Sequence, residues 1–286
     1  MRSPETNFLS ARLVLRARAF AERKISMKPT FRFSATLAAT FGAWLALSGA
    51  PKHAQADMPR TPVLVELFTS EGCSSCPPAD ALLGELVRRQ PVPGAFVVAL
   101  GEHVDYWNKG GWTDRFSSHA LSARQSDYAA WFHNSTVYTP QMVVDGRTEF
   151  VGSDDAKASA AIARAARLPK AQVSVASGAQ PGVYTVSVRN LPLLAPGDAA
   201  DVYLAVTESG VRSHVGGGEN RGQTLTHVAV VRSLEKIGTA KAGETFSVQR
   251  RLPPSTGEQG SSRSVLAFVQ ARGSRRVLGA ALASRE

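Results

Sequence analysis

The sequence contains two cysteines, Cys73 and Cys76, with two serines between them. This spacing allows the two sulfurs to form a disulfide bond and to exchange it with other thiols. The pair follows the apolar residues 63–68 and precedes Pro77 and Pro78, which are tolerated in the first turn of a helix. We therefore expect a strand-to-helix turn that places the first sulfur at a helix N-terminus, where unpaired N–H groups favour the thiolate.

Two other interpretations of the cysteine pair remain open. A disulfide of this kind can be purely structural. Zinc could also bind here, but zinc takes four ligands, so His103, His119 or His133 would have to supply the missing ones. The strand-to-helix context favours redox chemistry, and we expect no metal and no organic cofactor.

The segment up to residue 168 alternates between patterns typical of buried strands and of helices. Residues 63–68, interrupted only by Glu66, and residues 96–100 are apolar runs that suit strands buried on both faces of a sheet. Asp145-Gly146 joins two further short strands in a hairpin. Helical patterns cover residues 77–87, 118–132 and 155–167. This order predicts an α/β domain over residues 57–168, with a helical insertion before the hairpin.

The pattern changes at Leu168-Pro169. Beyond this point, short alternating apolar runs are separated by Gly, Pro and Asn residues at near-regular spacing, which is typical of an all-β sandwich. Gly216-Gly217-Gly218 lacks the lysine and the helix of a phosphate-binding loop, so it is expected to form a hairpin turn. We therefore expect a second, sandwich-like β domain over residues 169–286.

Thr139-Pro140 is the second element with chemical meaning, because it lies just before the predicted buried strand that begins at Gln141. Together with the Cys-x-x-Cys motif it resembles the thioredoxin fold, in which a cis-proline packs over the disulfide. In that fold the backbone of the residue before the proline pairs with a substrate strand. The resemblance implies that Pro140 orients a client and Thr139 binds it, while Cys73 is the exposed nucleophile and Cys76 resolves the mixed disulfide.

The resemblance extends to a particular family. The motifs are similar to those of the secreted thioredoxin-like family that is catalogued as domain of unknown function 1223, and they cover about residues 61–155. The similar segments are residues 68–80, His103-Val104-Asp105-Tyr106-Trp107, Gly111-Trp112, Arg124-Gln125 and residues 137–146, with further likeness at 219–222 and 227–232. Membership implies a thioredoxin-like fold and an exported location, without an established substrate.

Glu66 is the nearest match to the buried acid that thioredoxins carry on their first strand. It lies seven residues before Cys73, one residue further away than in those proteins. A buried carboxylate has a raised pKa and could accept the proton of Cys76. The one-residue offset leaves a second possibility, in which Glu66 faces solvent at a strand end.

Polar and aromatic side chains follow the second predicted strand, at the carboxyl edge where α/β sheets bind their ligands. They are His103, Asp105, Trp107 and Trp112. These residues could wall a groove beside Cys73, with the rings holding an unfolded client segment and His103 shifting the thiol pKa. The alternative is a packed loop in which the histidine has a hydrogen-bond partner, since aromatic side chains are usually buried in cores.

The net charge of +10 is concentrated near the N-terminus. Residues 1–56 carry nine basic and two acidic side chains, so most of the excess charge lies there. The rest of the chain has little excess charge and gives no reason to expect nucleic acid as a partner.

The same N-terminal segment has the features of an export signal. From Met27 it shows a basic start, an apolar stretch over residues 33–47 and the small-residue sequence Ala54-Gln55-Ala56. The apolar stretch is shorter than the about 20 residues of a membrane span, which disfavours a stable membrane anchor. We expect Met27 to be the true start, residues 1–56 to form a removable signal segment, and the mature protein to be periplasmic or secreted.

Two functions of different classes follow from these observations. The first is an exported thiol–disulfide oxidoreductase that acts through Cys73 and Cys76 on protein thiols or disulfides, with a redox partner that the sequence does not identify. The second is a binding module in which the disulfide is locked and the scaffold holds a peptide or an envelope component. Solvent access and reducibility of Cys73 distinguish the two.

The export signal makes a prediction about the mature N-terminus. Cleavage after Ala56 should leave Asp57 as the first residue, because the small-x-small site follows the apolar stretch at the usual distance. Mass spectrometry of the exported protein should therefore give the mass of residues 57–286. A mature form that still contains the apolar stretch would contradict cleavage and favour an anchor.

Overall fold

The computed structural model describes residues 60–253 and 259–283. These residues belong to one compact unit, Ala54–Glu286. The predicted signal segment, residues 1–56, lies outside the described residues. Within them, no helix combines the length and the apolar character needed to cross a membrane.

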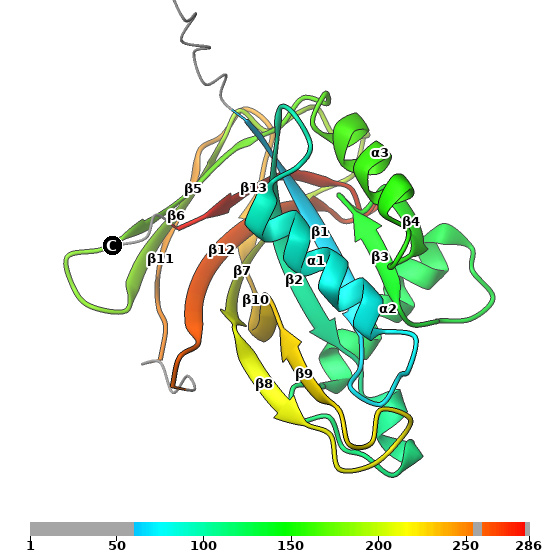
Figure 1. Cartoon of the computed structure of the whole chain (residues 1–286). Coiled ribbons are helices and arrows are strands. Elements are labelled where there is room, and N and C mark those ends of the chain that lie inside the picture. Colours follow the sequence, from blue (N-terminus) through cyan, green and yellow to red (C-terminus); the bar gives the residue numbers. More distant parts are fainter. Residues whose placement is uncertain (1–59, 254–258, 284–286) are drawn as a thin grey trace, which may run out of the picture. The chain divides into compact units, whose positions relative to one another are not determined.

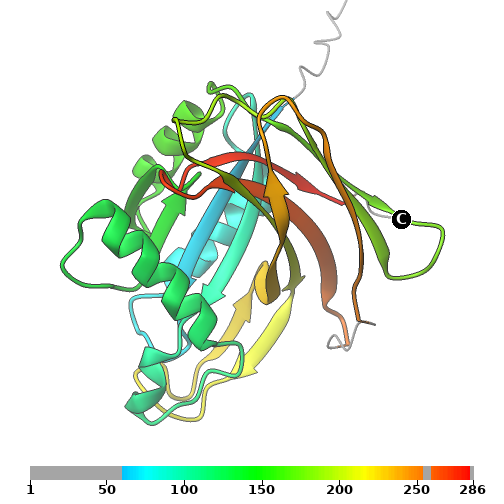
Figure 2. The same cartoon turned by 180° about the vertical axis from the view of Figure 1, so that it is seen from behind.

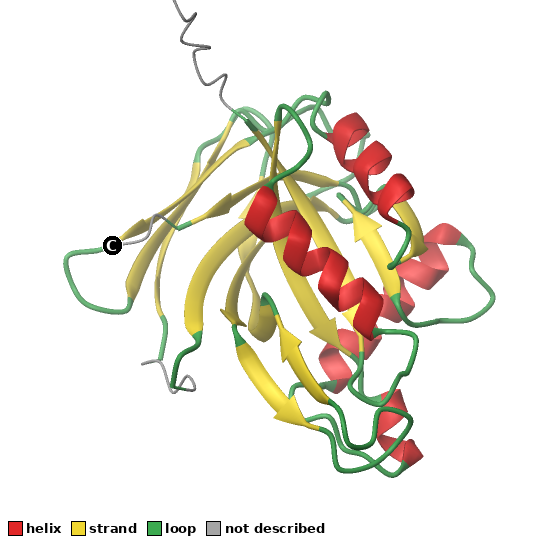
Figure 3. Cartoon of the chain, in the orientation of Figure 1, coloured by secondary structure: helices red, strands yellow, loops and turns green. Residues whose placement is uncertain are grey.

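The described residues form three α-helices, one short 3-10 helix and thirteen β-strands (Figures 1 and 3). The helices are α1 (Pro77–Arg89), η1 (Tyr106–Gly110), α2 (His119–Phe132) and α3 (Asp155–Ala165). The first four strands are β1 (Thr61–Thr69), β2 (Ala95–His103), β3 (Gln141–Val144) and β4 (Thr148–Val151). The others are β5 (Gln172–Ser177), β6 (Val183–Arg189), β7 (Ala200–Ser209), β8 (Val211–His214), β9 (Thr224–His227), β10 (Val230–Ala240), β11 (Phe246–Arg251), β12 (Ser262–Ala271) and β13 (Val277–Leu282).

Eight of these strands form one mixed sheet, in the order β13-β12-β7-β10-β2-β1-β3-β4. β1 and β2 are parallel and are joined by α1, because parallel neighbours need a crossover connection. β3 is antiparallel to both β1 and β4. Two smaller sheets, β11-β6-β5 and β8-β9, accompany the large one. The described part of the chain is therefore a mixed α/β structure with a large mixed sheet and additional β-sheets.

The division that the sequence suggests at residue 168 does not divide the main sheet. β7, β10, β12 and β13 come from the C-terminal half, and β10 pairs with β2 through Val230 and Gly101. β5, β6 and β11 form a separate sheet whose apolar side chains pack with those of β7 and β12, as in a sandwich. The expected independent β-sandwich over residues 169–286 is therefore not what the structure shows. Alternating apolar residues predict strands, but they do not predict which distant strands pair.

The side chains of β1 alternate between the two faces of the sheet. Val65 and Leu67 pack with Leu83 of α1 on one face. Leu64 packs on the other face, where α2 contributes Leu121. Figures 1 and 2 show α1 and α2 on these opposite sides. A strand covered by helices on both faces is buried throughout, which explains its almost continuous apolar sequence.

The predicted helix starts are confirmed by the residues that cap them. α1 begins at Pro77, as the proline pair indicates. The Ser118 side chain caps α2 by accepting a hydrogen bond from the N–H of Leu121. Asp154 caps α3 in the same way by accepting from the N–H of Lys157. The starts of these helices are therefore determined by residues next to them in the sequence, and the start of α1 follows directly on the cysteine turn.

The hairpin turn at Asp145-Gly146 joins β3 to β4 and also contacts the C-terminal half of the chain. The Asp145 side chain accepts a hydrogen bond from the N–H of Leu64, and its carbonyl accepts one from the N–H of Val277 at 2.8 Å. Gly146 has a φ of +61°, and a Cβ atom there would lie 1.9 Å from the carbonyl oxygen of Arg275. The turn therefore leaves no room for a side chain against the β12–β13 connection.

This close approach predicts a large difference between two glycine substitutions. Gly94→Ala places a side chain at a φ of +76° with nothing within 4 Å, so it should cost only the roughly 1–2 kcal/mol of a left-handed conformation. Gly146→Ala adds a backbone collision and should cost about 1–3 kcal/mol more than the control. Urea unfolding of both variants measures the difference. Equal losses of unfolding free energy would show that the turn does not pack on Arg275.

Candidate functional site

Cys73 and Cys76 form a disulfide at the turn between β1 and α1, with their Cα atoms 5.5 Å apart. Cys76 is the N-cap of α1, and its N–H donates to the carbonyl of Cys73 at 3.2 Å. The second cysteine rather than the first therefore occupies the helix N-terminus, because the helix starts at Pro77, after both cysteines. This corrects the expectation from the sequence.

The zinc interpretation of the cysteine pair is not supported. Both sulfurs are bonded to each other, so neither is a thiolate ligand. Within residues 60–253 and 259–283, no three or more His, Cys, Asp or Glu side chains are grouped so that they could hold a metal ion.

Both cysteines are fully buried, at 0% exposure, whereas the sequence analysis expected Cys73 to be exposed. The two serines between them are exposed, whereas the sulfurs lie inside. The Cys73 Sγ atom lies 3.3 Å from the hydroxyl of Ser75. A hydroxyl at this place can donate to a thiolate and favour it. Solvent does not reach the Cys73 sulfur in this conformation.

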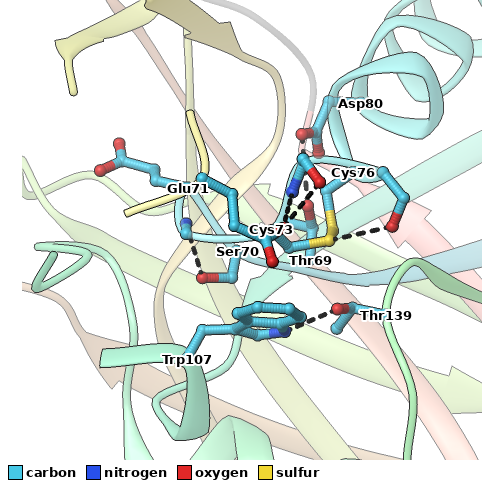
Figure 4. The surroundings of a disulfide bond; sticks show 12 residues. Thr69, Ser70, Glu71, Cys73, Cys76, Asp80, Trp107 and Thr139 are labelled. Carbon is cyan, nitrogen blue, oxygen red and sulfur yellow. Dashed lines mark hydrogen bonds between the residues drawn. A yellow bond between two sulfur atoms is a disulfide. The ribbon is translucent and has the colours of Figure 1, made fainter. Parts of the chain in front are cut away.

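Trp107 lies between the cysteine turn and the Thr139-Pro140 segment (Figure 4). Its indole N–H donates to the Thr139 hydroxyl at 2.7 Å. On the other side, a Cβ atom placed on Gly72 would lie 3.4 Å from the Cβ of Trp107. Pro140 is buried, and its peptide bond with Thr139 is cis, as the resemblance implies. The structure therefore brings Trp107 to the cysteine turn and attaches Thr139 to Trp107.

Beneath the turn, Glu71 and Asp114 connect it to His103 at the end of β2. The N–H of Glu71 donates to the Asp114 Oδ2 atom at 2.9 Å. The same oxygen is 2.7 Å from the Nδ1 atom of His103, which is 1% exposed. His103 is thus a buried residue with a hydrogen-bond partner, which agrees with the packed-loop alternative, and it reaches the cysteine turn through Asp114.

The Glu71 carboxylate holds two further segments. The Trp112 indole N–H donates to its Oε2 atom at 2.8 Å. The Nε2 atom of His227, in β9, lies 3.3 Å from its Oε1 atom. The rings of His227 and His103 are 4.8 Å apart in an edge-to-face arrangement. The predicted site residue Trp112 therefore belongs to a buried polar cluster, Glu71, His103, Trp112, Asp114 and His227, which we call the Glu71 cluster.

Hydrogen bonds and opposite charges in this cluster outweigh burial and the repulsion between the Glu71 and Asp114 carboxylates. Burial alone would raise the pKa of Glu71, but its interactions with His227 and Trp112 lower that pKa below the ordinary value. Burial likewise opposes ionisation of Asp114, and His103 reverses this and lowers the Asp114 pKa. Burial would lower the pKa of His103, but Asp114, Asp80 and Glu71 raise it. Two carboxylates and one imidazolium are thus the favoured ionisation states.

Glu66 lies on the opposite face of the sheet from α1. Its carboxylate accepts hydrogen bonds from the Arg124 guanidinium at 2.6 and 2.8 Å and from the Tyr128 hydroxyl at 2.8 and 3.0 Å. Both partners belong to α2, which covers the face away from the cysteines. The expected proton transfer between Glu66 and Cys76 is therefore wrong. The solvent-facing alternative is also wrong, because Glu66 is 1% exposed.

Asp105 is the N-cap of η1 and contacts α2. Its N–H donates to the Ser122 hydroxyl at 3.0 Å, and its carboxylate accepts from the same hydroxyl. His119 also lies 3.4 Å from this carboxylate. These contacts attach η1, which carries Trp107, to α2, so Asp105 supports the site through the position of η1.

Asp80 is a site residue that the sequence analysis missed. It lies in the first turn of α1, and Figure 4 shows it beside Cys76. The Thr69 hydroxyl donates to its Oδ2 atom at 3.2 Å, and burial raises its pKa above the ordinary value. The sequence does contain a signal for Asp80. It lies four residues after Cys76, and residues four apart lie on the same face of a helix.

The C-terminal half contributes residues to the cysteine turn that the sequence analysis noted only as family-like segments. The Asn220 side chain donates to the carbonyls of Glu71 and Cys73, each at 2.9 Å. The Glu219 carboxylate accepts from the N–H of Ser74 at 2.9 Å. No local sequence pattern connects residues so far apart. The resemblance of residues 219–222 to the family was the feature of the sequence that pointed to Glu219 and Asn220.

The raised pKa of His103 predicts how stability depends on pH. A group with a raised pKa in the folded state stabilises the fold fully below its unfolded pKa, about 6.5, and loses that contribution as pH rises through the folded value. The free energy of unfolding should therefore fall between pH 6 and pH 8.5, as measured with urea. His103→Gln should be less stable at pH 6 and should show a smaller fall. A wild-type protein that becomes more stable over this range would contradict the His103–Asp114 ion pair.

Comparison with solved structures supports the fold. The crystal structure of protein AGR_C_4864 from Agrobacterium tumefaciens is similar with a TM-score of 0.62 and 26% sequence identity, over 79% of this chain and 95% of that chain. HBP35 of Porphyromonas gingivalis is similar with a TM-score of 0.50 and 15% identity, over 78% of this chain and 74% of that one. At this identity the second likeness concerns the fold alone.

The comparison of sequences gives the family. No curated protein matches the chain. The model of the family described as "Protein of unknown function (DUF1223)" matches residues 64–270, a span that includes the cysteine turn, Thr139-Pro140, the Glu71 cluster and Asn220. The match covers well over half of the sequence and confirms the family resemblance of its motifs, so the chain belongs to the DUF1223 family.

Proposed function

We propose that this protein exchanges disulfides with protein clients through Cys73 and Cys76. The observation that carries the proposal is the disulfide at the turn from a buried strand into a helix, with Thr139-Pro140 brought beside it across Trp107. A helix N-terminus favours negative charge on nearby sulfur. The resemblance to thioredoxins implies that a client strand would pair with the Thr139 backbone.

The reaction that we propose is reversible. In one direction the Cys73 thiolate attacks a sulfur of a client disulfide, forms a mixed disulfide and expels one client thiolate. The Cys76 thiolate then attacks the Cys73 sulfur, which reforms the Cys73–Cys76 disulfide and releases the second client thiolate. Two electrons pass from the cysteine pair to the client. In the other direction a client dithiol reduces the pair by the same steps.

Two neighbouring side chains support this division of roles. The Ser75 hydroxyl is 3.3 Å from the Cys73 sulfur, where it can donate a hydrogen bond to a thiolate. Asp80 lies beside Cys76 with a raised pKa, so it is suited to take the Cys76 proton when that thiol attacks. Asp80 thereby replaces Glu66 as the proposed proton acceptor.

We extend the same proposal to the thioredoxin-like arrangement of residues 61–165 and to the location of the mature protein. The succession of strand, Cys-x-x-Cys, helix, strand, Pro140 hairpin and helix in residues 61–165 supports a thioredoxin-like arrangement. We place the mature protein in the periplasm or outside the cell, because the export signal read from residues 27–56 and a cysteine pair in a disulfide both suit an oxidising compartment. Its partners would then be client proteins and a redox protein of that compartment.

One observation favours the second function. Both cysteines are at 0% exposure, which suits a disulfide locked inside a binding module. In that case Trp107 and the loop around it would hold a peptide or an envelope component, and the disulfide would only stabilise the turn.

The two functions differ in what cysteine variants capture. Cys76→Ser should accumulate mixed disulfides with clients when the protein is produced in its own compartment, because the attacking thiol remains and the resolving thiol is gone. Cys73→Ser should accumulate none, and it serves as the matched control with a single free thiol. Non-reducing electrophoresis followed by mass spectrometry identifies the adducts. Absence of adducts in both variants would favour the binding module.

A further inference from the structure

A nine-residue segment between β8 and β9 lies against the cysteine turn. It comprises residues 215–223, drawn in yellow in Figure 1, and we call it the strap. Its own backbone is closed by hydrogen bonds between Val215 and Gln223 at 2.9 Å and between Gly222 and Val215 at 2.7 Å. The strap is therefore a structured turn rather than an open loop, and it can hold side chains in fixed positions.

Asn220 connects the strap to the cysteine turn from inside. Its side-chain nitrogen donates both hydrogens, one to the carbonyl of Glu71 and one to the carbonyl of Cys73, each at 2.9 Å. Its side-chain oxygen accepts from Gln223 at 3.3 Å, which fixes the orientation of the amide. Asn220 is 1% exposed, so water does not compete for these bonds.

Glu219 connects the strap to the turn from outside. Its carboxylate accepts hydrogen bonds from both the N–H and the hydroxyl of Ser74, at 2.9 and 2.6 Å. These bonds lower the pKa of Glu219, so the side chain stays charged at neutral pH. Hydrogen bonds to a charged acceptor are stronger than neutral ones. The strap is thus attached to consecutive positions of the turn, Cys73 and Ser74.

The glycines of the strap allow its backbone to come this close. A Cβ atom on Gly217 would lie 2.3 Å from the carbonyl oxygen of Gly111. A Cβ atom on Gly218 would lie 3.3 Å from the Cβ of Trp112 and 3.8 Å from the Cα of Gly72. The strap therefore packs on the cysteine turn and on the Trp112 loop together, and side chains at Gly217 would push it away.

We propose that Asn220 and Glu219 are positioning residues that hold the cysteine turn closed, and that release of the strap exposes Cys73 to its reaction partner. This inference rests on the proposed function only in assigning that partner, because closure itself concerns access to the disulfide. The inference explains why the Cys73–Cys76 disulfide lies at a strand-to-helix turn, where reactive disulfides occur, and is nevertheless fully buried. Under this inference the locked disulfide and the reactive disulfide are two states of one site.

The test measures how fast a small reductant reaches the disulfide. The oxidised mature protein is mixed with the phosphine TCEP at neutral pH, and the thiols formed are alkylated and counted by mass spectrometry. The wild type should react slowly. Glu219→Gln and Asn220→Asp should react about ten-fold faster or more, since each removes charge-assisted or buried hydrogen bonds to the turn. Arg221→Ala, an exposed strap residue, is the matched control and should keep the wild-type rate.

The dependence of this rate on urea separates positioning from general destabilisation. Release of a nine-residue strap exposes little surface, so the reduction rate should rise with urea much less steeply than global unfolding does. Glu219 is exposed, so its variant tests the strap even if Asn220→Asp fails to fold. Wild-type rates in folded Glu219→Gln and Asn220→Asp, or a slope equal to that of global unfolding, would overturn the inference.

The reduction rates of the strap variants and the capture of clients by Cys76→Ser can succeed or fail separately. If Cys76→Ser captures clients while the strap variants react at the wild-type rate, the strap inference fails and the proposed function stands. If the strap variants open the disulfide but no client is captured, the strap inference stands and the oxidoreductase assignment fails.

Discussion

Glu71 carries a buried negative charge two residues before Cys73, and the surrounding segments have to compensate for it. A buried carboxylate costs several kcal/mol of solvation, so it persists only where donors and positive charge surround it. Trp112 and His227 meet the carboxylate, while the Glu71 backbone contacts Asp114 and Asn220. One residue therefore ties the cysteine turn to the segment after β2 and to the β8–β9 hairpin.

The surroundings of the cysteines are therefore built from both halves of the chain. The N-terminal half supplies the sulfurs, Trp107 and the Thr139-Pro140 segment. The C-terminal half supplies the strap that lies on the same turn, and its strands extend the sheet in which β1 is embedded. The strap, which bonds to Cys73 and Ser74, and the strands that extend the sheet are parts of one compact unit. Under the strap inference, a change in the strap is expected to act on access to the disulfide without a change in the chemistry of the sulfurs.

The sequence predicted those features that local chemistry decides. Helix starts follow from Pro77, Ser118 and Asp154, and the hairpin turn follows from Asp145-Gly146, because each of these residues acts on its own neighbours. Trp107 lies beside the cysteine turn and donates to Thr139, and the Thr139-Pro140 peptide bond is cis. The sequence does not predict which side of the sheet Glu66 faces. Leu64 and Phe68, on the same side as Glu66, are as apolar as Val65 and Leu67 on the other side. The alternation of β1 therefore does not show which face α1 covers.

Long-range pairing explains the other differences. The exposure of Cys73 could not be predicted, because the donors that hold its turn come from Asn220, 147 residues away. The sheet that joins the two halves depends on β10 meeting β2, and alternating apolar residues in β10 would suit a separate sandwich equally well. The position of the cysteine turn between a strand and a helix was therefore predictable from the sequence, whereas the burial of the cysteines was not.

The reduction potential of the Cys73–Cys76 pair tests the central claim most directly. The mature protein would be equilibrated with glutathione buffers of known ratio, and the reduced fraction measured by alkylation and mass spectrometry. A redox-active pair should have a potential between about −270 and −120 mV, the range of known dithiol proteins. A potential below about −300 mV, typical of structural disulfides in secreted proteins, would contradict the account and assign the disulfide to stability alone.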